Sequence, residues 1–75
     1  MQVAEVREIV ALAQIDPSLY SFESEQHESL CLVAFGQTWK VFISERGARV
    51  EEQDFDSQDA ACVYSLKRLF QLAQH

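Results

Sequence analysis

Apolar residues near the start of the chain recur at three- and four-residue spacing, at Val3, Val6, Ile9, Val10 and Ala13. Charged residues fall between them, which is typical of an amphipathic helix with one side packed against a core. Pro17 disfavours helical geometry at the residue before it, so we predict that this helix ends by about Ile15.

The middle of the chain follows the shorter period of β-strands. The pattern predicts strands over 19–23, 30–35, 39–44 and 48–53. The run 30–35 is continuously apolar and is bounded by Gly36, which is typical of a central strand covered on both faces. Because the connections are short, we expect an antiparallel meander, since parallel neighbours usually need a crossover of roughly a dozen residues or more.

A second amphipathic helix is predicted from about Ser57 to about Ala73. Asp56 or Ser57 can cap its N-terminus, and Asp59 favours the positive end of the helix dipole. The predicted order is therefore one helix, four strands and one helix. At 75 residues, this predicts a single domain over 1–75, a two-layer α+β fold with its helices packed on an antiparallel four-stranded meander sheet.

Strand alternation makes Phe42 a candidate contact residue. If Trp39, Val41 and Ile43 face the helices, Phe42 faces away from them beside apolar residues of the neighbouring strand. An open sheet face of that kind would be an interface. The alternative is that a helix or a loop covers this face.

The segment 51–59 carries five carboxylates and no basic residue. A regular strand that keeps Val50 inward would also turn Glu52 and Asp54 inward, which is costly, so we expect the pairing to end or bulge just after Val50. Glu51, Glu52 and Asp54 would then lie on a protruding strand end and loop. We predict these three residues as charge contacts for a basic partner.

Net charge narrows the classes of partner. Twelve acidic and six basic residues give a formal net charge of -6. Such a surface repels phosphate backbones, which argues against direct binding of nucleic acid, and it attracts basic proteins. The simpler alternative is that the acidic balance keeps a small protein in solution.

Motifs for localisation, metals and catalysis are weak in this sequence. The N-terminal segment has early acids and no uninterrupted apolar core, so we expect a cytoplasmic protein without a membrane span. The acidic segment lacks the glycine of a calcium loop, and we expect no metal and no cofactor. Cys31 or Cys62 with His27 is the possible nucleophilic pair, but both cysteines lie in apolar runs, so we expect no enzyme activity.

Two segments resemble a known protein family. Residues 39–47 read Trp-Lys-Val-Phe-Ile-Ser-Glu-Arg-Gly, and residues 55–64 read Phe-Asp-Ser-Gln-Asp-Ala-Ala-Cys-Val-Tyr. Their order resembles that in small bacterial immunity proteins of polymorphic toxin systems of the contact-dependent inhibition type. The resemblance covers roughly the C-terminal half of the chain. It implies a cytoplasmic protein that binds and neutralises a cognate toxin domain, commonly a basic nuclease, by non-catalytic contact.

A second interpretation comes from the strand pattern alone. A small adaptor or subunit could use the open sheet face around Phe42 to form a homodimer or to bind another protein. The two interpretations differ in the partner, which is a toxin in the first and a second copy or a stable complex in the second.

Overall fold

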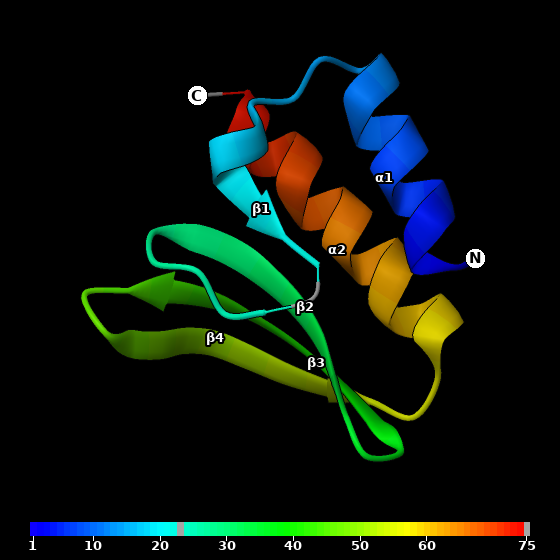
Figure 1. Ribbon diagram of the computed structural model, residues 1–75, viewed down its shortest axis with the longest axis vertical. Coiled ribbons are helices and arrows are strands. Elements are labelled where there is room, and N and C mark those ends of the chain that lie inside the picture. The colour runs from blue at the N-terminus through cyan, green and yellow to red at the C-terminus, as the bar shows by residue number, and fades with distance from the viewer. Residues whose placement is uncertain (23, 75) are drawn as a thin grey trace.

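The computed structural model describes residues 1–22 and 24–74. Along the chain these residues form helix α1 (Val3–Leu12), a 3-10 turn η1 (Pro17–Leu19), strands β1 (Tyr20–Ser21), β2 (Ser29–Phe35), β3 (Thr38–Glu45) and β4 (Ala48–Phe55), and helix α2 (Gln58–Ala73). The predicted α+β class and the order of helices and strands are confirmed. Both helices lie on one side of the sheet (Figure 1).

The ends of the helices follow local signals. Helix α1 ends at Leu12, three residues before the predicted limit, because Gln14 adopts a left-handed conformation with φ of 57°. Pro17 then begins η1, and the Asp16 carboxylate accepts a hydrogen bond from the Ser18 amide. At α2, the Ser57 hydroxyl accepts from the Ala60 amide at 3.1 Å, which confirms Ser57 as the N-cap.

The sheet order is β1-β2-β3-β4, and the first pairing differs from the prediction. Strands β2, β3 and β4 form the expected antiparallel meander, but β1 runs parallel to β2. In a parallel pair, the connection must run back from the end of the first strand to the start of the second. Because β1 has only two residues, this distance is short and no long crossover is needed. Glu23, the last residue of the predicted strand 19–23, lies outside the described residues.

The irregularity predicted after Val50 is present. Val50 pairs with Ile43 and Gln53 pairs with Val41, so two residues of β4 stand opposite the single residue between them on β3. Glu51 takes a left-handed conformation with φ of 54°. This β-bulge keeps Val50 on the helix side and turns Glu52 and Asp54 to the other side of the sheet.

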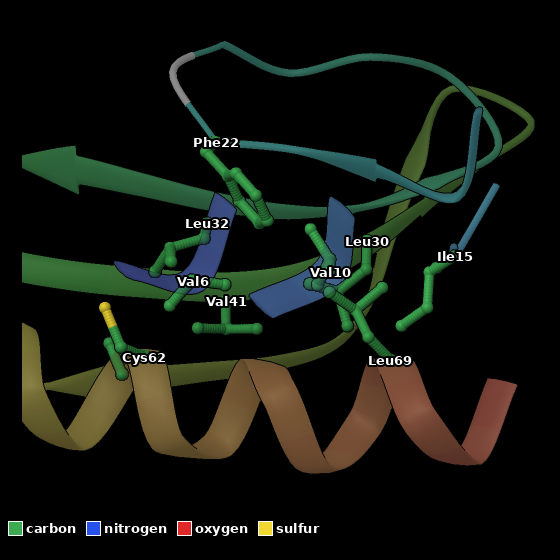
Figure 2. Packing of buried hydrophobic residues seen from close by; sticks show 10 residues of the cluster. Val6, Val10, Ile15, Phe22, Leu30, Leu32, Val41, Cys62 and Leu69 are labelled. Atoms are coloured by element: carbon green, nitrogen blue, oxygen red, sulfur yellow. The ribbon is translucent and has the colours of Figure 1, made fainter. Parts of the chain in front are cut away.

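The core lies between the helices and one face of the sheet. Leu30, Leu32 and Val41 of the sheet pack against residues of both helices, and all three are at most 1% exposed (Figure 2). The helices contribute Val6, Val10, Ala61, Cys62 and Leu69. Every one of these side chains is apolar, so this face holds the two layers together by burial.

Candidate partner-binding surface

The sheet face opposite the helices is covered at the position where we expected it to be open. Phe42 lies on that face, as strand alternation predicted, but its side chain is only 1% exposed. The guanidinium carbon of Arg49 is 4.5 Å from the centre of the Phe42 ring and 5.4 Å from that of Phe35. The expectation of an exposed apolar anchor at Phe42 is therefore wrong in this conformation, because a cation from β4 stacks over the ring.

The connection between β1 and β2 contributes to the same cover. Glu25 in this connection binds Arg49 at 3.0 Å. The Ser29 hydroxyl donates to the Gln26 carbonyl at 2.7 Å, and Cys31 lies fully buried beneath, within hydrogen-bonding distance of Gln26. Of the two predicted possibilities for this face, the structure therefore has the one in which a loop contributes to its cover.

The three acidic candidates each bind a cation of the same chain. Asp54 binds Lys40 at 2.9 Å, Glu52 binds Arg49 at 3.4 Å, and Glu51 binds Arg68 at 2.8 Å. Their carboxylates remain accessible, with side-chain exposures of 57%, 38% and 56% respectively. These are surface ion pairs, which contribute little to folding and can exchange for pairs with another molecule.

The bulge divides these acids between the two sides of the sheet. Glu51 reaches Arg68 on α2, whereas Glu52 and Asp54 reach Arg49 and Lys40 on the opposite face. They therefore line the border of the sheet along β4 and do not form a single cluster. Lys40 and Arg68 stand 14 and 17 residues away from their partners, so the local sequence gave no sign of these pairs.

The ion pairs shift the protonation equilibria of their cations. The hydrogen bond to Asp54 is the largest cause that raises the pKa of Lys40 above its usual value. The pKa of Arg49 is raised mainly by its hydrogen bond to Glu25 and further by Glu52. Both side chains are cationic at neutral pH, so this region is an alternating array of charges.

The two residues of the predicted nucleophilic pair differ in their access to solvent. Cys31 is fully buried, whereas His27 is exposed on the connection before β2. Burial is the largest cause that raises the pKa of the Cys62 thiol, which opposes formation of a thiolate at neutral pH. Within 1–22 and 24–74, no three side chains of His, Cys, Asp or Glu type are grouped so that they could hold a metal ion.

A second accessible region lies at the other border of the sheet and was not predicted. A pocket of about 360 Å³ opens beside the distal half of β2, and its lining residues are Val3, Phe22, Val33, Ala34, Trp39 and Gln58. The Val3 amide donates to the Gln58 side chain at 2.9 Å, which joins the first turns of the two helices at the pocket. The strand pattern could not reveal this pocket because it depends on where the two-residue β1 stops.

No protein-family model, curated protein or solved structure matches this chain. In the described part of the chain, neither helix is long and apolar enough to cross a membrane.

Proposed function

We propose that this chain is a cytoplasmic immunity protein, which binds a cognate toxin domain and neutralises it without catalysis. The observation that carries the proposal is the border of the sheet along β4. Glu51, Glu52 and Asp54 lie there with exposed carboxylates, on a strand with no neighbour on its outer side among the described residues. A basic protein can reach these groups without any rearrangement of the core.

Charge accounts for how such a partner would be attracted. The chain carries a net charge of -6, and nuclease toxins need a basic cleft to hold nucleic acid. Opposite fields raise the association rate of two proteins, and added salt weakens this effect. Lys40, Arg49 and Arg68 already compensate the three acids. In the proposal, the acids therefore steer the basic partner towards β4 and exchange their ion pairs for pairs with it.

The segments that carry the family resemblance form the structural frame of this border. Gly47 has φ of 80° in the turn between β3 and β4, and Ser57 caps α2. The Phe55 ring lies 5.2 Å from the Tyr64 ring, between centroids, and so joins the end of β4 to α2. These roles are structural, so the resembling residues support the frame and leave the contact residues free to vary.

The test begins with capture of a partner by the tagged protein at low salt. The toxic domain of that partner is then expressed in bacteria with and without this chain. Restored growth, together with a stable complex of the two proteins, is the expected result. A captured partner without toxicity, or toxicity that this chain leaves unchanged, would reject the immunity role.

The role of the acidic border has its own test. Glu52→Lys combined with Asp54→Lys should slow association with the toxin, and the difference from the unmodified protein should shrink as salt is added. Glu8→Lys with Glu45→Lys is a control of equal charge change at exposed positions outside this border. Equal association rates for the two double variants at low salt would remove β4 from the interface.

A further inference from the structure

The outer side of the two helices carries most of the exposed apolar side chains. Among the described residues, four large apolar side chains are exposed, and three of them lie on the helices: Leu12 at 85%, Val63 at 39% and Phe70 at 41%. Val63 and Phe70 stand seven residues apart and so share one side of α2. Cys62 and Leu69 have the same spacing and are fully buried towards the sheet (Figure 2). Helix α2 therefore has two apolar stripes, and the core uses only one of them.

The two helices run side by side in the same direction (Figure 1). The Val3 amide donates to the Gln58 side chain at 2.9 Å, which joins the first turns, and residues from both C-terminal ends line one pocket. Leu12 follows Val3 by nine residues, and Phe70 follows Gln58 by twelve. Since each residue of a helix adds about 1.5 Å, Leu12 and Phe70 are within about one turn of the same level.

Leu12 lies on the flank of α1 that is next to α2. Arg7 lies on the opposite flank, because its guanidinium carbon is 5.7 Å from the centre of the Phe22 ring. Figure 2 shows Phe22 and α2 on opposite sides of Val6 and Val10 of α1. Leu12 follows Arg7 by five residues, which is about 140° around a helix. The exposed side chains of Leu12, Val63 and Phe70 therefore form one surface, which we call the helical patch.

Most charged groups of the helices already have contacts within the chain. Asp59 binds the amino group of the chain, and Arg68 binds Glu51 on the β4 side of α2. The Glu5 carboxylate accepts at 2.9 Å from the backbone amide of the residue that caps α1. Together with Arg7, these are all but two of the charged residues on α1 and α2.

The two others are Glu8 and Lys67. Both are exposed, and neither forms an ion pair with any residue that the structure describes. Lys67 stands four residues after Val63 and three before Phe70, and Glu8 stands four before Leu12, so both belong to the helical patch. Counted from the joined first turns, Glu8 and Lys67 are also within about one turn of the same level. The patch thus carries one charge of each sign.

These opposite charges determine how a second copy would fit. If two copies stack their helices about a two-fold axis parallel to the helices, α1 of each copy lies on α2 of the other. This arrangement brings Glu8 close to Lys67 of the other copy twice, and it brings Leu12 close to Phe70. An axis across the helices would place each helix on its own counterpart, so Glu8 and Lys67 would not meet. Charge complementarity therefore selects the parallel axis.

The size of the helical layer indicates how strongly two copies would associate. Helix α2 has 16 residues, and neighbouring helices pack about 10 Å apart, so the layer measures roughly 24 Å by 20 Å. Two such faces would bury on the order of 1,000 Å² in total, near the low end for specific complexes. The net charge of -6 on each copy adds repulsion. We therefore expect association between micromolar and millimolar concentration.

We propose that the helical patch binds a second copy of this chain, with α1 of each copy on α2 of the other and with ion pairs between Glu8 and Lys67 of different copies. This dimer differs from one through the sheet face around Phe42, because it uses the opposite side of the molecule. It leaves β4 accessible, since β4 lies in the other layer.

Sedimentation equilibrium of the full chain, from micromolar to millimolar concentration, measures the association. The mean mass should rise from 8.6 kDa towards twice that value. A mass of 8.6 kDa at every concentration would overturn the proposal. A mass that continues to rise beyond the dimer would also do so, because a two-fold interface closes on itself.

Charge reversal tests the arrangement of the two copies. Lys67→Glu and Glu8→Lys each place like charges at both contacts, so each should weaken the dimer by roughly tenfold or more. In an equimolar mixture of these variants both contacts join opposite charges, and dimers should form as in the unmodified chain. Loss of affinity without recovery in the mixture, or no loss in either variant, would contradict the arrangement.

Net charge alone predicts a different result for Glu8→Lys. This change makes each copy less negative, so general repulsion between copies decreases and the dimer would become stronger. Glu45→Lys is the matched control, because it has the same charge change at an exposed position on β3. It should not weaken the dimer. Equal weakening by Glu8→Lys and Glu45→Lys would reject the ion pairs.

The apolar contact has its own variant. Leu12→Ser should weaken the dimer by roughly tenfold, whereas the fold should change little because this side chain is 85% exposed. Phe35→Ser is the control, since Phe35 is the fourth exposed apolar residue and lies on the sheet. Circular dichroism and thermal unfolding verify the fold of each variant. An unchanged dimer for Leu12→Ser, or equal losses for both variants, would place the interface elsewhere.

The dimer and the immunity role can be tested separately. Association with a toxin is measured below micromolar concentration, where the chain is a monomer, so Glu8→Lys serves as a control for β4 there. Leu12→Ser should bind the toxin as the unmodified chain does. If it lost both the dimer and the toxin, the helical patch would be the surface for the toxin, against the proposal.

Discussion

Among the described residues, strand β4 and the distal half of β2 both border the sheet, yet their exposed sides differ in chemistry. β4 carries charged residues on both sides of a bulge, and its acids bind cations from three elements. The border of β2 is apolar from Leu32 to Phe35, and a pocket lies against it. Charges and bulges are the usual means by which proteins prevent strand addition, so β4 is protected against it, whereas β2 has neither a charge nor a bulge from Leu32 to Phe35.

The largest expected effect compares both borders within one row of the sheet. Leu32, Val41 and Gln53 are paired across three strands on the helix side. Leu32→Ala should lower the free energy of unfolding by about 2–5 kcal/mol, because Leu32 is fully buried. Gln53→Ala, at an exposed position, should change it by less than about 0.5 kcal/mol.

Urea unfolding of the two variants measures this difference. A typical chain of this length has a stability of about 4–11 kcal/mol, so the Leu32 variant should lose a large part of it. Similar midpoints for the two variants would mean that the helices cover the row evenly, and the two borders would then not differ in burial.

The bulge residue provides the second test. Glu51→Val should destabilise the protein by about 1–2 kcal/mol, since a β-branched residue is disfavoured at a φ of 54°. The free energy of unfolding of Glu51→Gly should exceed that of Glu51→Val by at least the same amount. Both variants lose the ion pair with Arg68, so this loss cancels in the comparison. Thermal unfolding of the two variants measures the cost of the left-handed backbone conformation at this position. A valine variant as stable as the glycine variant would show that the bulge can move along β4.

Features made by residues close together in the chain could be predicted from the sequence, and features made by distant residues could not. The bulge after Val50 followed from the alternation of a single strand, and the Ser57 cap followed from four adjacent residues. Burial of Phe42 could not be predicted in this way, because Arg49 from β4 and Glu25 from the connection between β1 and β2 provide the cover. Parity predicted the direction of that side chain, but its exposure depends on elements that parity does not describe.

The same distinction explains the two candidate sites. The acids of β4 were visible as a run of like charges, whereas their cations come from β3, β4 and α2 and could not be assigned. The pocket beside β2 depends on β1 ending after two residues and on its parallel direction. Neither property has a local signal, since 19–23 has the composition of a longer strand.

Arg49 provides the third test, because it joins β4 to the covered face. Arg49→Ala should cost about 0.5–1 kcal/mol and expose Phe42, with increased binding of a dye that reports apolar surface. Arg49→Lys keeps the charge but loses the planar stacking and the forked contacts to Glu25 and Glu52, so it should fall between the alanine variant and the unmodified protein. No increase in dye binding for the alanine variant would assign the cover to the connection alone.

The smallest expected effect concerns the protonation of Lys40. Because the hydrogen bond to Asp54 is the largest cause of the raised pKa, Asp54→Asn should lower the pKa of Lys40 towards its ordinary value. Glu52→Gln should lower it less, since Glu52 acts only through a weaker coulombic effect. A raised pKa in the folded protein means that the pair stabilises the fold at neutral pH and that this contribution is lost as the pH rises through the raised value, above about 10.5. An NMR titration of the Lys40 side chain in both variants measures which substitution lowers its pKa more. A larger decrease for Glu52→Gln would mean that Lys40 exchanges partners along β4. The proposed encounter with a basic protein requires the same exchange of the acids there.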